Sequence, residues 1–155
     1  MSRLFLDIKL MGQYFLLVNK DKQEYVCPWC LGGGAKLWEW AANSEIRIVA
    51  LLLRQSNEGG GGDWYGYHQG YDEGECVECK QGKHGEDAKV VGSWAGDRVV
   101  LVGDYDKSDL FDEARNTYRN LSLDLARAFN QFIEIPEYRL KTELCGEQCR
   151  GRAAK

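Results

Sequence analysis

Two Cys-x-x-Cys pairs, separated by a long spacer, constrain this chain more than any other feature of its sequence. The first pair is Cys27 and Cys30, and the second is Cys76 and Cys79. A tetrahedral zinc ion takes four thiolates, and each Cys-x-x-Cys pair supplies two neighbouring corners of that tetrahedron. Glycine follows closely after each pair, which suits the tight turn of a zinc knuckle. We therefore expect these four cysteines to bind one structural Zn²⁺.

Other roles for the same cysteines remain open. A redox pair similar to that of the glutaredoxins would place Cys27 at the start of a helix, but glycines occupy positions 32–34 and make a poor helix opening. His84 follows the second pair and is an alternative ligand in place of one cysteine. Buried cysteines that hold no metal are the remaining interpretation.

The last two cysteines, Cys145 and Cys149, form a Cys-x-x-x-Cys pair in a polar segment. On a helix this spacing would bring both sulfurs to one face. Three roles are open for the pair: it joins the metal site, it forms a second site with His68 or His84, or it stays exposed in a polar tail. The exposed tail is the default interpretation.

Composition indicates one folded domain of ordinary size. The chain has 155 residues, of which 44% are hydrophobic and 28% charged, so a packed core is feasible. Its net charge is −4, and the basic excess typical of proteins that bind nucleic acid is missing. No apolar run is long enough to cross a membrane, and Asp7 and Lys9 interrupt the apolar start of the chain. We expect a soluble, intracellular, cytoplasmic protein whose partner is another protein rather than nucleic acid or a membrane.

Strand-forming residues predict a small antiparallel sheet. Residues 14–19 and 24–26 flank a polar turn and indicate one hairpin, which ends at Cys27. Residues 90–95 and 98–103 flank a Gly-Asp turn and indicate a second hairpin. The sheet would draw its strands from these four segments.

Helices are predicted on both sides of the second hairpin in sequence. Residues 35–42 have helical composition, and 46–55 favour a helix over a strand. Ser108 or Asp109 would cap a third helix and Ser122 a fourth. The fold class is therefore α+β, with helices packed on one face of the sheet and an irregular loop clipped by zinc.

That irregular loop covers residues 56–87 and is rich in glycine and acidic residues. It also carries a group of aromatic side chains that favour protein contacts. Aromatics that only fasten the loop to the core are the alternative. The candidate interaction surface consists of Trp64, Tyr65, Tyr67 and Tyr71.

Three segments, MGQYFLLVNKDKQEY, GGAKLWEW and GSWAGDRVVLVGDYD, resemble a family of small proteins that has no assigned function. The resemblance implies no activity, cofactor or catalytic residue. It implies that the shared domain starts at Met11, so translation from Met1 or from Met11 is an open choice. We divide the chain into an extension at 1–10, one domain at 11–140 and a polar, partly disordered tail at 141–155.

These observations favour a zinc-stabilised binding or adaptor module, which could be a subunit of a larger assembly. The sequence contains no P-loop, dinucleotide fingerprint, nucleophile elbow or HExxH motif. The alternative is a small hydrolase or transferase that uses carboxylates near the 90–106 hairpin, assisted by His68 or His84. The candidate carboxylates are Asp97, Asp104 and Asp106.

Overall fold

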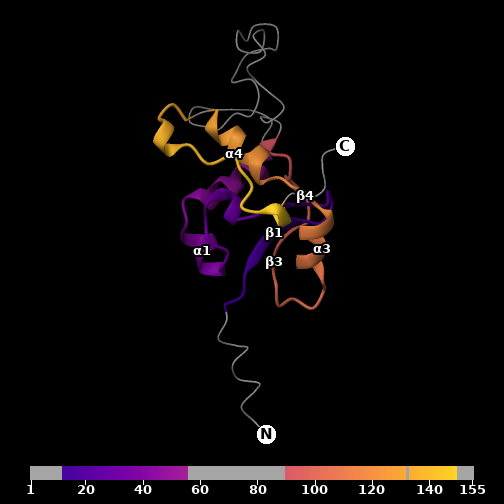
Figure 1. Ribbon diagram of the computed structural model, residues 1–155. Helices are drawn as coiled ribbons and strands as arrows, with labels where there is room; N and C mark the ends of the chain where they lie inside the picture. The colour runs from indigo at the N-terminus through magenta and orange to yellow at the C-terminus, as the bar shows by residue number, and fades with distance from the viewer. Residues whose placement is uncertain (1–11, 56–89, 132, 150–155) are drawn as a thin grey trace.

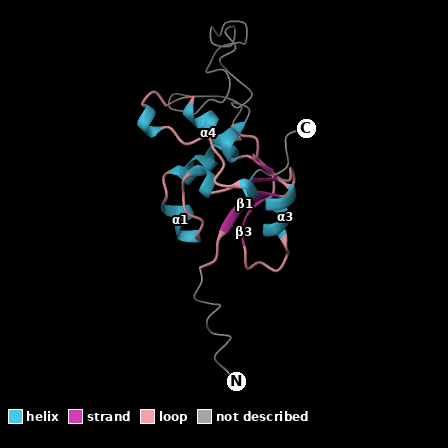
Figure 2. Cartoon of the chain, viewed as in Figure 1, coloured by secondary structure: helices cyan, strands magenta, loops and turns pink. Residues whose placement is uncertain are grey.

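A four-stranded sheet forms the centre of the computed structural model, which describes residues 12–55, 90–131 and 133–149 (Figures 1 and 2). The order of the strands in the sheet is β3-β1-β2-β4. The strands are β1 (Phe15–Asn19), β2 (Glu24–Val26), β3 (Val99–Gly103) and β4 (Arg119–Asn120).

Strand β1 lies between two antiparallel neighbours. Leu17 is paired with Val26 of β2 on one side and with Leu101 of β3 on the other. The predicted β1–β2 hairpin is confirmed, and buried Asn19 closes its turn by accepting the backbone N–H of Lys22 at 2.9 Å. Strand β4 runs parallel to β2. The predicted α+β class is confirmed, but the sheet is mixed rather than wholly antiparallel.

The predicted strand at 90–95 is wrong, so β3 has no hairpin partner at that position. The backbone N–H of Gly92 donates to the carbonyl of Leu51 at 2.7 Å, and that of Trp94 donates to Leu52 at 2.9 Å. Gly92 and Gly96 have φ values of 76° and 82°, which give the segment a turn conformation. Trp94 is fully buried among the core side chains. Tertiary packing therefore overrides the strand propensity of this segment.

The predicted helices form close to where the sequence placed them. The segment at 46–55 is helical but has 3₁₀ geometry, in which Arg47 N–H donates to Ser44 three residues earlier. The longer helices are α1 (Leu37–Ala42), η3 (Glu45–Leu53), α3 (Leu110–Thr117) and α4 (Ser122–Asn130); short 3₁₀ turns are η2 (Trp29–Leu31), η5 (Pro136–Tyr138) and η6 (Glu147–Cys149).

The helices cover both faces of the sheet, which corrects the expectation that they pack on one face. Leu16 and Val18 belong to a core cluster that contains residues of α3. Leu17 and Val26 belong to another, with residues of α1, η3 and α4. Figure 1 shows α1 and α3 on opposite sides of β1. The physical reason is the continuous apolar run of β1, because a strand without alternation is buried on both faces.

Candidate metal centre

Four cysteine sulfurs from two distant segments converge beyond the end of β2. Each sulfur lies within 4.8 Å of every other, and only Cys145 is exposed. The nearest pair, Cys145 and Cys149, is 3.1 Å apart, and Cys30 lies 3.5 Å from Cys145. Cys27 lies 3.6 Å from Cys149 and 3.8 Å from Cys145. These four residues, Cys27, Cys30, Cys145 and Cys149, are called the cysteine cluster below.

The distances in the cysteine cluster fit a metal site and exclude a disulfide. All four cysteines are free, and a disulfide would need sulfurs about 2.05 Å apart. Sulfurs placed about 2.3 Å from a tetrahedral metal ion are about 3.8 Å from one another. The cysteine cluster therefore has the size needed to hold one metal ion.

A tight turn after β2 positions the first two sulfurs. The carbonyl of Pro28 accepts the backbone N–H of Leu31 at 3.1 Å and that of Gly33 at 3.0 Å. Gly32 completes the turn with a φ of 82°, a conformation that other residues adopt only with strain. The chain reverses within this turn and brings Cys30 back beside Cys27, as the knuckle prediction required.

The second pair of sulfurs comes from η6 and the residues just before it, since Cys149 ends η6 and Cys145 precedes it. The backbone N–H of Cys149 donates to the carbonyl of Gly146 at 3.0 Å, which folds Cys149 toward Cys145. Cys149 is only 1% exposed, so the default interpretation of exposed tail cysteines is wrong for this residue. The structure instead matches the option in which the Cys-x-x-x-Cys pair joins Cys27 and Cys30.

Asn120 of β4 connects the two halves of the cysteine cluster. Its Nδ2 donates to the carbonyl of Cys149 at 2.8 Å and lies 3.7 Å from the sulfur of Cys30. Its Oδ1 accepts the hydroxyl of Ser122 at 2.6 Å. The same hydroxyl oxygen accepts the backbone N–H of Cys27 at 2.7 Å. Asn120 is not predictable as a site residue from the sequence, because a lone asparagine between two helices carries no metal signal.

The electrostatics of the cysteine cluster favour a bound cation. Thiol hydrogen bonds from Cys149 and Cys27 lower the pKa of Cys30 far below that of an ordinary thiol. Hydrogen bonds with Cys149 and Cys30, together with burial, raise the pKa of Cys27. Once one of the four adjacent thiols has ionised, repulsion between like charges opposes ionisation of the others. A divalent cation would remove that opposition.

The remaining predicted metal and interaction residues lie outside the described ranges. Cys27 and Cys30 are near Cys145 and Cys149, whereas their predicted partners fall between residues 55 and 90, outside the described ranges. The histidines and the aromatic interaction surface fall there as well. The residues outside the described ranges are Cys76, Cys79, His68, His84, Trp64, Tyr65, Tyr67 and Tyr71.

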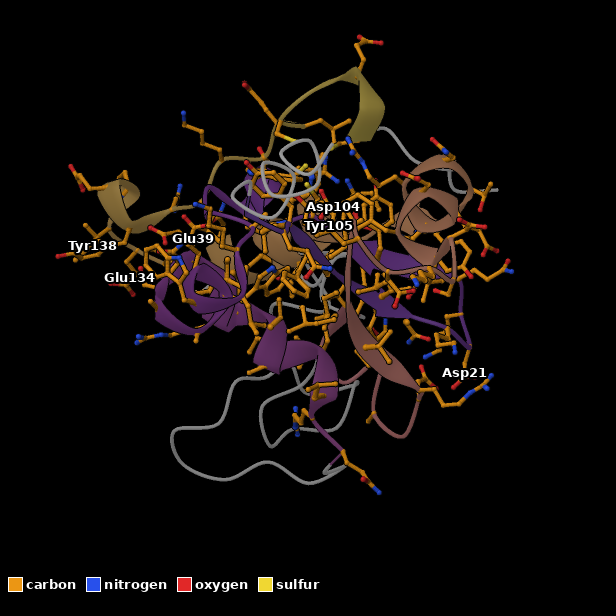
Figure 3. All side chains as sticks on the ribbon, turned by 90° about the horizontal axis from the view of Figure 1, so that it is seen from below. Asp21, Glu39, Asp104, Tyr105, Glu134 and Tyr138 are labelled. Carbon is orange, nitrogen blue, oxygen red and sulfur yellow. The ribbon has the colours of Figure 1, made fainter. Side chains whose placement is uncertain are left out.

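The candidate carboxylates do not converge on one point. Asp97 precedes β3 and accepts the side-chain amide of Asn19 at 2.8 Å. Asp104 follows β3 and accepts the backbone N–H of Tyr14 at 3.0 Å. A strand rises about 3.3 Å per residue, so these two carboxylates are about 20 Å apart. Figure 3 shows Asp104 well separated from Asp21, which binds Arg98 near the Asp97 end of β3.

Asp106 has a local role as well. Its carboxylate accepts the backbone N–H of Ser108 at 2.9 Å and is also bonded by the Ser108 hydroxyl. These bonds lower the pKa of Asp106 and stabilise the turn before α3. Asp97 is thus engaged in structural hydrogen bonds before β3, and Asp104 and Asp106 after it.

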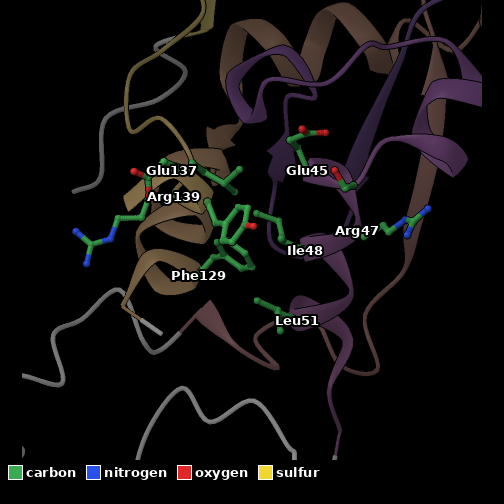
Figure 4. A pocket seen from close by; sticks show the side chains of 10 residues that line it. Glu45, Arg47, Ile48, Leu51, Phe129, Glu137 and Arg139 are labelled. Carbon is green, nitrogen blue, oxygen red and sulfur yellow. The ribbon is translucent and has the colours of Figure 1, made fainter. Parts of the chain in front are cut away.

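A cavity of about 460 Å³ lies between η3, α4 and residues 137–140, and none of the four cysteines lines it (Figure 4). Apolar side chains, including Ile48, Leu51 and Phe129, form much of its lining. Figure 4 shows the side chains of Arg47 and Arg139 pointing away from it. The cavity lining is therefore largely apolar, and Glu45 and Glu137 also belong to it.

Comparison with protein-family models, with curated proteins and with solved structures finds no match to this chain. Among the helices of the described residues, none has the length and apolar character that crossing a membrane requires. The function proposed below therefore rests on the geometry of the molecule itself.

Proposed function

We propose that the cysteine cluster binds one structural Zn²⁺ and that the domain it stabilises is a binding or adaptor module within a larger assembly. The convergence of four sulfurs supports this proposal. Four protein ligands fill a tetrahedral shell and leave no position for water or substrate, which is the arrangement of structural rather than catalytic zinc sites. Zinc and iron both accept four thiolates in this geometry, so metal analysis has to distinguish them.

The position of the cysteine cluster explains what bound zinc would stabilise. Cys27 and Cys30 follow the first hairpin, whereas Cys145 and Cys149 lie beyond α4 in sequence. A zinc ion would join these segments directly. Metal binding in small zinc modules supplies folding free energy on the order of 10 kcal/mol. Zinc would therefore hold residues 141–149 against the sheet.

Two double variants test which cysteines bind the metal. We expect about one zinc per chain in purified protein, and we expect Cys145→Ser with Cys149→Ser to lose it. The matched control, Cys76→Ser with Cys79→Ser, should keep it, because the cysteine cluster already provides four ligands. Elemental analysis of both proteins gives the answer. Zinc that is lost only with Cys76 and Cys79 would contradict our ligand assignment.

The adaptor role is supported by exposed aromatic side chains. Trp38 of α1 is 65% exposed and Tyr138 of η5 is 68% exposed, and aromatic residues are enriched where proteins meet. We expect the aromatic surface at residues 64–71 to bind a protein partner. Trp64→Ala with Tyr67→Ala should release proteins that copurify with the wild-type chain. Trp38→Ala tests separately whether the α1 surface also holds a copurifying protein. Unchanged copurification in all variants would contradict the adaptor role.

A further inference from the structure

Strand β3 forms one edge of the sheet, and its outer side is open within the described structure. The β1–β3 ladder fixes which backbone groups face outward. Lys20 N–H donates to Arg98 C=O, and Asp104 N–H donates to Tyr14 C=O, both at 2.9 Å. Because bonded pairs alternate in an antiparallel ladder, the even-numbered residues of β3 bond to β1 and the odd-numbered ones point away.

The outward groups belong to Val99, Leu101 and Gly103. The Gly103 carbonyl accepts the N–H of Asp106 at 3.0 Å. In the described part of the chain, no hydrogen bond reaches the outward N–H or C=O of Val99 or Leu101. These groups form a short row of donors and acceptors that matches another strand.

The side chains of β3 leave this edge open to pairing. Edge strands are usually blocked by proline, charged side chains or a bulge, and β3 has the sequence VVLVG. Val100 and Leu101 are 38% and 39% exposed. The two residues belong to opposite faces of the sheet, so apolar surface is available on both sides of the edge.

We propose that β3 pairs with β3 of a second copy of this chain, antiparallel and around a two-fold axis through Leu101. In this register Leu101 bonds to Leu101 of the partner copy, and Val99 bonds to Gly103 of the partner copy at each end. The backbone groups of all three residues face outward, so the ladder uses every outward-facing residue of β3. This proposal does not depend on the bound metal.

Charge complementarity supports a second copy as the occupant. The same register places Arg98 opposite Asp104 of the partner copy, once at each end of the ladder. Arg98 holds Asp21 at 2.6 Å while its side chain remains 73% exposed, so a second carboxylate can reach it. Opposite charges across a strand pair are stabilising. The edge is therefore complementary to itself in both backbone and charge.

Pairing through β3 would stop at two copies. The opposite edge of the sheet is β4, which contains only Arg119 and Asn120. So short an edge is a poor template for a further strand. The result is a closed dimer with one continuous sheet. A five-residue ladder buries less surface than interfaces of standard size, so the dimer should be reversible.

Charge substitutions at the two-fold axis test this proposal on the full chain. Position 101 faces itself, so Leu101→Lys and Leu101→Glu should each weaken dimerisation at least about fivefold, because like charges would be directly opposed. An equimolar mixture of the two variants should dimerise again. Leu37→Lys, at an exposed position of α1, is the control and should dimerise like wild type. Sedimentation equilibrium measures each mass against the 17.6 kDa of one chain.

Three results would overturn the proposal. The first is a wild-type chain that stays monomeric up to about 1 mM, as it would if another segment of the same chain covered the edge. The second is a dimer that persists in both Leu101 variants, since another surface would then hold it. The third is a mixture of folded variants that remains monomeric although wild type dimerises. Circular dichroism of each variant confirms that it is folded.

Discussion

At the scale of single residues, Asn120 is the side chain that most directly supports the cysteine cluster. Its amide bonds the Cys149 carbonyl and lies beside the sulfur of Cys30. Groups that orient metal ligands typically change metal affinity about 10- to 100-fold when removed. We expect Asn120→Ala to lower zinc affinity within this range, measured by competition with a chromophoric chelator.

Asn130 provides a matched control for Asn120. Its amide also bridges backbone groups, donating to the Leu140 carbonyl and accepting the Leu140 N–H, each at 2.8 Å. Neither bond involves the cysteine cluster. Asn130→Ala should therefore destabilise the fold and leave zinc affinity unchanged. Equal losses of affinity in the two variants would assign Asn120 a general structural role only.

At the scale of elements, the turn after β2 can be tested through its glycine. Gly32 and Gly96 both have a φ of 82°, and an added Cβ would meet nothing within 4 Å at either position. Alanine should therefore cost about 1 kcal/mol of unfolding free energy at each site through backbone strain alone. Gly32→Ala should also weaken zinc binding, whereas Gly96→Ala should not. Urea unfolding and chelator competition measure the two effects separately, and an equal zinc affinity in both variants would contradict this role for the turn.

Local patterns predicted the elements whose conformation depends on neighbouring residues. The β1–β2 hairpin follows from strand propensity. Helices α3 and α4 begin near their predicted positions, but the predicted caps are not made, because Asp109 forms no capping bond and Ser122 lies inside α4 after Leu121. The segment 90–95 has equal strand propensity, yet contacts with η3 and the burial of Trp94 decide its conformation. Such contacts join residues far apart in sequence, and local propensity carries no information about them.

The candidate site also has one half that local sequence predicts and one half that depends on tertiary structure. The turn that presents Cys27 and Cys30 is local, so spacing and the following glycines identified it. Their neighbours Cys145 and Cys149 are set by tertiary structure. In the sequence, two Cys-x-x-Cys pairs look more alike than a Cys-x-x-Cys and a Cys-x-x-x-Cys pair. That likeness favoured Cys76 and Cys79 as the partners.

At the scale of the whole molecule, zinc would hold the last described segment to the rest of the domain. We expect chelation to expose residues 141–149 to protease before the sheet is cleaved, because a bound metal would tie Cys145 and Cys149 of this segment to Cys27 and Cys30. Mass spectrometry of limited digests identifies the first cut. The variant with Cys145→Ser and Cys149→Ser should be cut there without chelator. A first cut within β1 or β2 would contradict this order.

The two halves of the cysteine cluster also differ in when they are synthesised. A ribosome releases the chain from its N-terminal end, so Cys27 and Cys30 emerge long before Cys145 and Cys149. The first knuckle therefore leaves the exit tunnel as an open pair of thiols. A metal ion could take all four ligands only after every strand of the sheet has been translated. A nascent chain stalled after α4 would present half a coordination shell to the cell's metal-handling and quality-control machinery.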